Sequence, residues 1–423
     1  MPNSTIKTIR IKRGKEKQLV RHHPWVFSGA IENIEKMPDA CEQNAEDSIK
    51  SHTVRVEDSD HQFIAYGWYD EKSHIALRLL SWDEQVFPDS RWWKSMIIAA
   101  IRRRYDWFGQ KGRATNMFRL IHGEADMLPG FAIDIYKHIV VIQISARVAW
   151  AVRPTAVEAV EQALRPQTIM VNVDSDLRRV EHLESSVEYY CKGILVEPPE
   201  IVHQIDCMES GLLYRLNVRS SQKTGHYCDQ RENRIKVAQF AKNLKVLDLF
   251  CYTGGFTLHC LKSLCLSVDS VDSSDYALGQ LEENIRLNVQ NGRLPADSGN
   301  RVTLTKGDCF EVLRSIETDV YDMIIIDPPK LAPNRSHVEQ AERAYKDLNR
   351  LAMLKVKKGG YIATFSCSGA INREKFALIL SWAAKDAKKE VHIVSVLGQP
   401  NDHPIRLSFP ESEYLKGFIL QVL

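Results

Sequence analysis

A cysteine at the end of an apolar run is the residue of this chain best suited to covalent chemistry. Cys367 follows the apolar residues of the run Tyr361–Ala370, and a second apolar run upstream ends in Asp327 and two prolines. Because the carboxyl ends of parallel strands meet at one edge of a sheet, we expect the thiol and the carboxyl group to face one crevice. A thiol in that position predicts a covalent step on whatever the crevice holds.

A glycine pair after another apolar run predicts a ligand that approaches the backbone closely. Asp248 ends this run, and Tyr252, Gly254 and Gly255 follow in the turn. The turn lacks both GxGxxG and GxxxxGK[ST], which disfavours a dinucleotide and a phosphate-gripping loop. The glycines leave room for a ligand, and Asp248 can pair with an ammonium group.

Two further acids follow the next apolar runs in chain order. Asp272 stands where a carboxylate suits the two hydroxyls of a ribose, and Asp308 is placed to accept from an adenine amine. Ammonium, ribose diol and adenine amine together describe S-adenosylmethionine. Capping of helices or turns explains any one of these acids readily, but it explains Asp248, Asp272 and Asp308 together poorly.

A methyl donor beside a thiol predicts methylation at carbon 5 of a pyrimidine. That carbon is too electron-poor to take a methyl group until a thiolate adds at carbon 6, and the reaction also needs an acid at the base edge. Cys367 and Asp327 meet this requirement. An amino-methylating site usually places an aromatic residue after the paired prolines, whereas Lys330 stands there in this chain. For Cys367 the alternative is a small buried strand residue, which its polar neighbours disfavour.

The region 206–423 must position these residues. Strand and helix patterns alternate along it and predict an α/β fold, a doubly wound and mostly parallel sheet. The expected strands are 245–250, 267–271, 302–306, 321–326, 360–366, 391–397 and 415–423, and the expected helices are 254–263, 275–289, 309–316, 337–357 and 371–385.

Residues 86–205 predict a small α+β middle domain. Apolar residues repeat at helical spacing over 91–108, and a Leu-Pro-Gly turn between two strand-like runs predicts a hairpin. The remaining expected elements are strands at 140–144 and 168–173 and a helix at 154–164. We expect this domain to form one wall of a substrate cleft.

Residues 1–85 predict a small β-barrel of short strands separated by turns. Lys12, Arg13 and Lys15 lie in a basic stretch that aromatic residues, including Trp25, follow. Cations that hold phosphates and rings that stack on bases suggest RNA binding, and the alternative is an ordinary solvated face. The acidic, aperiodic stretch 35–52 predicts a mobile surface loop.

Composition narrows the class of protein. The chain has 423 residues, 44% of them hydrophobic, and a net charge of +2, so any affinity for a polyanion must come from local patches. Its nine cysteines follow no metal-ligand spacing, so no metal site is expected, and reduced thiols favour the cytoplasm. We expect no signal peptide, and no apolar run is long enough to span a membrane.

The assembled motifs resemble the RNA (cytosine-5) methyltransferases that carry a PUA domain, the group that acts on 23S ribosomal RNA. The resemblance covers nearly the whole chain, and its motifs are HPWVFSGAI from His23, KTGHYCDQR from Lys223, YTGGF from Tyr252, DPPK from Asp327 and TFSCSG from Thr364. It implies a PUA-like barrel, a middle domain and a Rossmann-like class I methyltransferase domain. It also implies that Cys367 is the nucleophile, that Asp327 contacts the base, and that Asp248, Asp272 and Asp308 line the cofactor pocket. We further expect Lys330 to contact RNA.

Three alternatives stay open at this point. Uracil-5 methyltransferases place their cysteine on the corresponding strand, guanine-directed relatives with this middle domain would not need Cys367, and an RNA-binding assembly factor would need no active site. The base that removes the carbon-5 proton is unassigned, because the second cysteine of better-known relatives is replaced by Lys330. The candidates for that base are Glu411, Glu413 and His403. A homodimer stays an open expectation.

Overall fold

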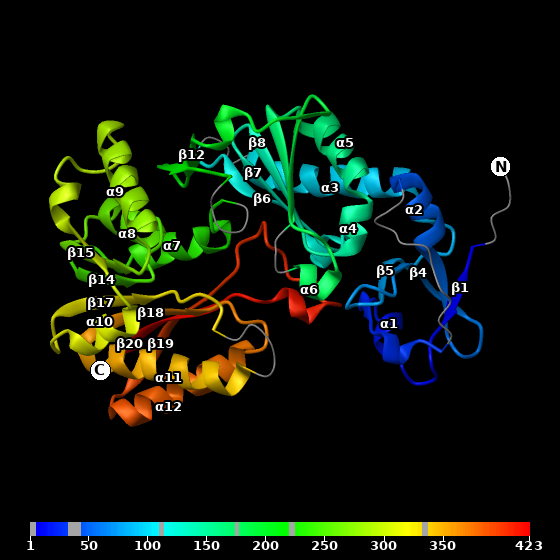
Figure 1. Cartoon of the computed structure of the whole chain (residues 1–423). Coiled ribbons are helices and arrows are strands. Elements are labelled where there is room, and N and C mark those ends of the chain that lie inside the picture. The colour runs from blue at the N-terminus through cyan, green and yellow to red at the C-terminus, as the bar shows by residue number, and fades with distance from the viewer. Residues whose placement is uncertain (1–5, 33–43, 110–113, 174–176, 220–224, 332–336) are drawn as a thin grey trace. The chain divides into compact units, whose positions relative to one another are not determined.

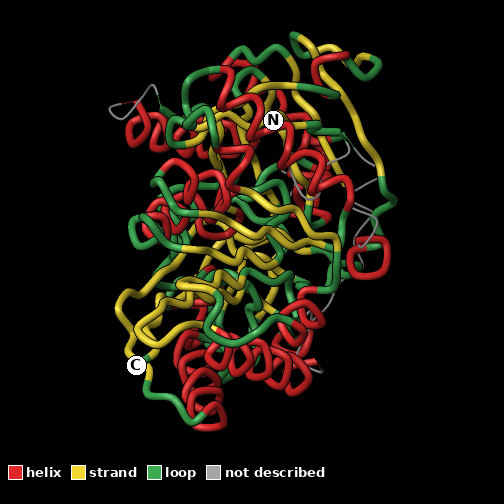
Figure 2. The backbone as a smooth tube through the Cα atoms, turned by 90° about the vertical axis from the view of Figure 1, so that its left-hand side faces the viewer, coloured by secondary structure: helices red, strands yellow, loops and turns green. Residues whose placement is uncertain are grey.

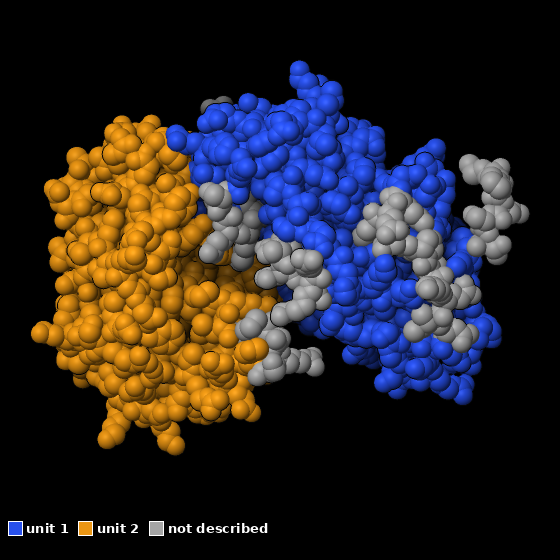
Figure 3. All heavy atoms as spheres, in the orientation of Figure 1, with its two compact units in different colours: residues 1–205, 216–226, 402–412 blue, residues 206–215, 227–401, 413–423 orange. Residues whose placement is uncertain are grey.

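A computed structural model describes residues 6–32, 44–109, 114–173, 177–219, 225–331 and 337–423. The chain divides into two compact units (Figure 3). Unit 1 comprises residues 1–205, 216–226 and 402–412, and unit 2 comprises residues 206–215, 227–401 and 413–423. The division into domains at 1–85, 86–205 and 206–423 stays a prediction, and unit 1 contains two separate sheets.

The first sheet of unit 1 has five strands in the order β1-β3-β4-β5-β2 (Figure 1). An isolated bridge between Ile11 and Ile31 links the segments that follow the two edge strands, as in a barrel. Buried apolar side chains of alternating strand positions fill the interior. The elements are β1 Thr8–Arg10, α1 Lys17–Val20, β2 Trp25–Val26, β3 Thr53–Glu57, β4 Phe63–Tyr69 and β5 Leu77–Ser81.

The expectation of a loop over 35–52 was wrong for its second half. Residues Ala45–His52 form helix α2, and the Asn44 side chain accepts a hydrogen bond from the Asp47 amide at 2.9 Å, as an N-cap does. Ile49 is buried and the His52 ring stacks on Trp68 with centroids 5.3 Å apart, so one face of the helix is packed. Residues 33–43 lie outside the described part of the chain.

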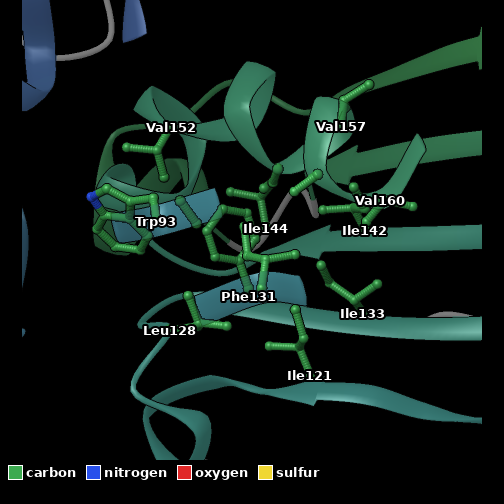
Figure 4. Packing of buried hydrophobic residues seen from close by; sticks show 14 of the residues in the cluster. Trp93, Ile121, Leu128, Phe131, Ile133, Ile142, Ile144, Val152, Val157 and Val160 are labelled. Carbon is green, nitrogen blue, oxygen red and sulfur yellow. The ribbon is translucent and has the colours of Figure 1, made fainter. Parts of the chain in front are cut away.

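The second sheet of unit 1 has six strands in the order β11-β10-β9-β8-β7-β6. Its buried residues pack against helices α3 and α5 in one continuous core, part of which Figure 4 shows around Phe131 and Trp93. The predicted helix, hairpin and strands of this region are confirmed. The elements are α3 Ser90–Gly109, β6 Met117–His122, β7 Phe131–Tyr136, β8 Ile139–Ile144, α4 Arg147–Ala151, α5 Arg153–Leu164, β9 Thr168–Val173, α6 Leu177–Glu181, β10 Ser186–Cys191 and β11 Ile194–Val196.

Unit 2 is built on a seven-stranded sheet in the order β16-β15-β14-β17-β18-β20-β19. The first five strands of this order are parallel, and β20 runs antiparallel to both of its neighbours. The predicted doubly wound sheet is therefore confirmed. Its strands are β14 Lys245–Leu249, β15 Ser267–Asp272, β16 Val302–Lys306, β17 Tyr321–Ile326, β18 Val356–Ser366, β19 Val391–Gly398 and β20 Lys416–Val422.

Helices cover both faces of this sheet, with α8 and α9 on one side and α11 and α12 on the other (Figure 1). Figure 2 shows the chain turned by 90°, with several helices beneath strands at the bottom of the view. The helices are α7 Arg231–Ala238, α8 Gly255–Lys262, α9 Asp275–Gln290, α10 Cys309–Ser315, α11 Val338–Lys355 and α12 Arg373–Ala387. Because the strand-to-helix turns follow β14, β15, β17 and β18, the polar residues after these strands gather at one sheet edge.

Two short elements complete unit 2. The hairpin of β12 Ile205–Glu209 and β13 Leu212–Leu216 is held to α9 by backbone bonds to Asn284 and Asn288 at 2.8 Å. The single turn Cys228–Gln230, η5, precedes α7.

Candidate active site

The turn after β14 has a backbone that L-residues adopt reluctantly. Phe250 and Tyr252 have φ values of 61° and 47°, and Gly254 has 85°. A Cβ atom at Gly254 would lie 2.0 Å from a Leu281 methyl carbon, and one at Gly255 would lie 2.4 Å from Nε of Arg234. Strained non-glycine residues cluster at ligand sites, and here they share a turn with two glycines at which a Cβ atom would displace a neighbouring side chain. The glycine pair was identified from the sequence, whereas the positive φ values of Phe250 and Tyr252 were not predicted.

Asp248 supplies a buried carboxyl group beneath this turn. Its side chain is fully buried, and Oδ2 accepts hydrogen bonds from the amide and hydroxyl groups of Thr257 at 3.1 and 2.7 Å. Oδ1 is buried without a hydrogen-bond partner among the described residues. Burial raises the pKa of Asp248 to about 7, and Asp272 contributes to the increase. An ammonium group from a ligand would both fill the open acceptor position and favour the charged form.

Asp272 ends β15 with its carboxylate already oriented. Oδ2 accepts from the amide of Tyr252 and Oδ1 from the amide of Ser274, both at 2.9 Å. The first bond fixes the strained turn after β14. Each carboxylate oxygen can accept a second hydrogen bond, which the hydroxyls of a ribose can donate.

Asp308 has a capping role in this structure. Its Oδ1 accepts from the amides of Phe310 and Glu311 at 2.8 and 3.1 Å, which makes Asp308 the N-cap of α10. Contact with an adenine amine stays a prediction. Because Oδ1 already accepts two hydrogen bonds, Oδ2 would be the acceptor for the amine.

Cys367 and Asp327 follow neighbouring strands. Ile326 on β17 pairs with Thr364 on β18, so the residues after these positions emerge side by side. The Cys367 side chain is half-buried, and its Sγ lies 4.0 Å from the carbonyl oxygen of Pro328. The structure thus places the predicted nucleophile next to the paired-proline motif.

Asp327 is held as an acid that can keep its proton near neutral pH. Its Oδ1 accepts from Nε2 of Gln230 at 2.9 Å. Burial raises the pKa of Asp327 to about 7, and the nearby carboxyl group of Asp229 adds to the increase, while Arg234 opposes it. A carboxyl group titrating near pH 7 is suited to donate and retrieve a proton.

The segment that supports Asp327 was named from the sequence as a motif, but no role beside the acid was predicted for its residues. Tyr227, Asp229 and Gln230 come from η5 and the residue before it, within the KTGHYCDQR motif. The Tyr414 hydroxyl donates to Oδ2 of Asp229 at 2.8 Å, and the Tyr227 ring meets Tyr252 edge-on with centroids 5.3 Å apart. Burial raises the pKa of Tyr227, and its electrostatic interactions with Tyr252, Asp229, Asp327 and Cys367 add to the increase. The available signal was a polar run immediately before the first helix of unit 2. Lys223 and Thr224 lie outside the described residues.

The remaining predicted residues of unit 2 lie around this pair. Lys330 is exposed beyond the prolines, in a position open to a polyanion. Glu413, one candidate for the base that removes the carbon-5 proton, forms an ion pair with Arg373 at 2.7 Å. Lys416 at the start of β20 was not singled out, and it is buried beside Cys367.

The other two candidates for that base belong to unit 1. Nδ1 of His403 lies 3.3 Å from Asp402, and its ring lies against His122 with centroids 5.1 Å apart. Nε2 of His23 lies 3.3 Å from Glu411. Their assignment stays a prediction.

The RNA-binding candidates of unit 1 differ in how exposed they are and in how many protein partners they already have. Lys12 and Lys15 are exposed, and exposed Arg13 pairs with Asp60 at 3.3 Å. Trp25 is partly buried, and its indole N–H donates to Glu124 at 2.9 Å while its ring contacts Phe409. Base stacking by Trp25 therefore stays a prediction for a ring that already has neighbours, whereas Phe27 is 49% exposed.

The described residues also bear on metal and membrane chemistry. They contain no group of three or more histidine, cysteine, aspartate or glutamate side chains that could hold a metal ion. Within the same described ranges, no helix is long and apolar enough to cross a membrane.

Comparison with known families agrees with this geometry. Residues 9–82 match a PUA-like domain, and residues 171–410 match the S-adenosylmethionine-dependent methyltransferases. The chain belongs to the S-adenosylmethionine-dependent methyltransferase family and carries a PUA-like domain. The predicted fold class and cofactor are thereby confirmed, and the open acceptor on Asp248 fits the amino group of that cofactor.

Individual relatives resemble the chain over its whole length. Ribosomal RNA large subunit methyltransferase I of Shewanella frigidimarina is 34% identical over 98% of this chain and 99% of its own. The protein of that name from Shewanella denitrificans is 35% identical with the same coverage.

Solved structures support the fold. A candidate S-adenosylmethionine-dependent methyltransferase from Streptococcus mutans matches with a TM-score of 0.78 and 18% identity, over 99% of this chain and all of the other. A candidate methyltransferase complexed with SAH, S-adenosylhomocysteine, matches with a TM-score of 0.79 and the same identity and coverage. At this identity the likeness concerns the fold alone.

Proposed function

We propose that this protein transfers a methyl group from S-adenosylmethionine to carbon 5 of a cytosine in 23S ribosomal RNA, through a covalent adduct with Cys367. The observation that carries the proposal is the pairing of a half-buried thiol with a carboxyl group whose pKa is about 7, at neighbouring strand ends. The names of the full-length relatives support large-subunit ribosomal RNA as the substrate.

The covalent step makes carbon 5 nucleophilic. The Cys367 thiolate forms a bond to carbon 6, the C5=C6 electron pair moves to form C4=C5, and the C4=N3 pair takes a proton at N3 from Asp327. Carbon 5 of the resulting enamine then takes the methyl group, and a C4=N3 double bond forms again. A base, for which Glu411, Glu413 and His403 stay the candidates, then takes the carbon-5 proton, which restores C5=C6 and expels the thiolate, and N3 returns its proton to Asp327.

Asp327 favours cytosine over uracil in this scheme. N3 of cytosine is an acceptor, whereas N3 of uracil carries a hydrogen. A carboxyl group with its pKa raised to about 7 is substantially protonated near neutral pH and can donate to the cytosine nitrogen. Gln230 then fixes the orientation of the carboxyl group through its bond to Oδ1.

We place the cofactor at the turn after β14 and the end of β15. We assign the amino group of the cofactor to Oδ1 of Asp248 and the ribose hydroxyls to Asp272, with Tyr252, Gly254 and Gly255 forming the backbone wall. When bound, the cofactor supplies an electrophilic methyl group on a sulfonium. Cations of the PUA-like region, Lys12, Arg13 and Lys15, hold the RNA backbone.

The test is methyl transfer from labelled S-adenosylmethionine to purified 23S ribosomal RNA, followed by mass spectrometry of the nucleosides. We expect 5-methylcytidine at one position. A label on 5-methyluridine would move the target to uracil, and a methylated guanosine would remove the need for Cys367. Absence of any transfer to naked RNA and to assembled large subunits would leave an RNA-binding assembly factor as the better description.

A further inference from the structure

Lys416 is a buried cation in a region otherwise rich in acids. It is the first residue of β20, opposite Ser366 in the antiparallel pairing with β18, and its side chain is only 1% exposed. Charged side chains are rarely this buried unless they have a partner, because leaving water is costly for an ammonium group. The position of Lys416 therefore calls for an explanation.

Neutral groups hold the ammonium in place. Nζ of Lys416 donates to the carbonyl oxygen of Ser368 at 2.7 Å and to that of Tyr414 at 2.8 Å. Among the described residues, no carboxylate oxygen lies within ion-pair distance of this nitrogen, and the nearby Glu413 pairs with Arg373. The two carbonyls fix the ammonium but carry no charge, and Glu413, which also favours the charged form of Lys416, is engaged by Arg373.

The anion available to compensate the ammonium charge is the Cys367 thiolate. Ser368 directly follows Cys367, so the bond to its carbonyl ties Lys416 to the turn that carries the thiol. Burial lowers the pKa of Lys416 to about 8, and its interaction with Cys367 is the first contribution that opposes the decrease. At neutral pH the lysine is therefore mostly charged.

Two further described residues that interact with the thiol carry no positive charge. Tyr227 before α7 and Tyr345 on α11 both interact with Cys367, and burial raises the pKa of each, so both are neutral at pH 7. Asp327 ends the adjacent strand and titrates near that pH. Arg373 and exposed Lys330 act on Lys416 itself, where both oppose its charge.

We infer that Lys416 is a positioning residue for Cys367, whose ammonium favours the thiolate and whose bond to the Ser368 carbonyl fixes the turn that presents it. The inference rests on the proposed function, in which Cys367 is the nucleophile. Tyr345 supports the same turn, because its hydroxyl lies 3.3 Å from Oγ of Ser368. The proton of the thiol leaves to solvent before RNA binds.

The test measures the reactivity of Cys367 in the full-length protein without RNA. Iodoacetamide alkylation rates are followed between pH 5.5 and pH 10 by peptide mass spectrometry, with half-buried Cys191 as an internal reference. A free thiol has its midpoint at about pH 8.5. In the unaltered protein we expect the midpoint for Cys367 to lie below this value. A midpoint at or above that value would overturn the inference without any variant.

Variants separate charge from packing. Lys416→Met should raise the Cys367 midpoint by about one pH unit and lower the alkylation rate at pH 7 roughly tenfold, whereas Lys416→Arg should retain most of the reactivity. Lys355 also donates to two backbone carbonyls in unit 2, at Arg314 and Ile316, so Lys355→Met is the matched control and should change nothing. Superimposed profiles for Lys416→Met and the unaltered protein would contradict the inference.

The outcome is distinguishable from failure of the proposed function. Alkylation reports the state of the thiol before any substrate is present. A low midpoint that Lys416→Met raises would uphold the inference even if another nucleoside were the methyl acceptor. Conversely, 5-methylcytidine formation together with a midpoint at or above that of a free thiol would uphold the proposed function and reject the role of Lys416.

Discussion

The seven-stranded sheet of unit 2 and the five-stranded sheet of unit 1 carry their functional residues in opposite ways. In the first, Asp248 is fully buried, its pKa is raised to about 7, and Lys416 is 1% exposed. In the second, Lys12 and Lys15 are exposed and Arg13 makes a surface ion pair. One sheet holds charges away from water, and the other displays them to it.

This difference follows from what each region has to do. Groups that exchange protons or meet a single small ligand gain from a dry, fixed environment, where hydrogen bonds and charges act strongly. Groups that capture a polyanion gain from solvated charges that release counterions on binding. Substitutions should therefore have large effects that respond to pH in unit 2, and small effects that respond to salt in the PUA-like region.

The largest effect is expected at Asp327. Replacing it with asparagine removes the proton donor at the base edge while keeping an acceptor for Gln230, and should lower kcat by about 10² to 10⁴-fold. Affinity for S-adenosylmethionine should change little. Steady-state kinetics with saturating RNA measure the effect.

Asp322 at the other end of β17 provides the control. It bonds Lys357 and the Lys245 backbone, far along the strand from the crevice. Asp322→Asn should leave kcat near its original value. Equal losses in both variants would mean that the strand tolerates no such change and that Asp327 has no special role.

Asp272 should give the next largest effect, on cofactor binding. Loss of its charge-assisted hydrogen bonds in Asp272→Ala should weaken S-adenosylmethionine binding by about 1.5–3 kcal/mol, measured by calorimetry on the full chain. Asp275→Ala removes an exposed carboxylate three residues away that pairs with Lys306, and should have no effect. Unchanged affinity in a folded Asp272→Ala protein would reject the assignment of this pocket.

Asp248 should make stability depend on pH in the cofactor-free protein. Because its pKa is raised from 3.8 to about 7 on folding, the folded state binds more protons between those values. The free energy of unfolding should therefore fall as pH rises through this window, by up to about 1.4 kcal/mol per pH unit from this group. In Asp248→Asn, which keeps an acceptor for Thr257, urea unfolding from pH 5 to pH 8 should show a flatter dependence; an identical slope would contradict the buried acid.

The smallest effect is expected in the PUA-like region. Reversing the charge of Lys12, Arg13 and Lys15 together should weaken RNA binding and reduce its logarithmic salt slope by about 0.7–0.9 for each phosphate that is no longer neutralised. Cofactor affinity should stay constant. Filter binding or anisotropy across a series of salt concentrations measures the slope.

Exposed lysines of unit 2 provide a control with the same change in net charge. Lys236, Lys242 and Lys385 are all exposed. If their reversal reduced the slope as much as reversal of the N-terminal triple, RNA binding would depend on overall charge and not on the PUA-like region.

Most of the fold was predictable because its periodicity is strong. The alternation of β14 to β18 with their helices was predicted from apolar patterns, and only element ends moved by a few residues. Helix α2 was missed because its acidic sequence lacks an apolar stripe, and only Ile49 and a few polar neighbours are buried. The polar sequence of α2 gives no sign that His52 packs against Trp68, a residue of strand β4.

The candidate site residues that lie at the ends of parallel strands were predictable from the sequence. Asp248, Asp272, Asp327 and Cys367 lie directly after strands or within their last two residues, so the edge of a parallel sheet predicts where they gather. Tyr227, Asp229 and Gln230 precede the first strand of the sheet, and Lys416 begins an antiparallel strand. Those residues reach the site through tertiary packing, which spacing along the chain does not reveal.

The central claim is that Cys367 forms a bond to carbon 6 of the target cytosine. It is tested most directly with RNA that carries 5-fluorocytidine at the methylated position, in the presence of S-adenosylmethionine. Fluorine cannot leave carbon 5 as a proton does, so the unaltered protein should accumulate a covalent protein–RNA adduct that survives denaturation and maps to Cys367. Cys367→Ser should lose both the adduct and turnover while still binding the cofactor, because a hydroxyl is a far weaker nucleophile than a thiolate near pH 7. A Cys367→Ser protein that methylates at nearly the original rate, with no adduct from the unaltered protein, would contradict the account.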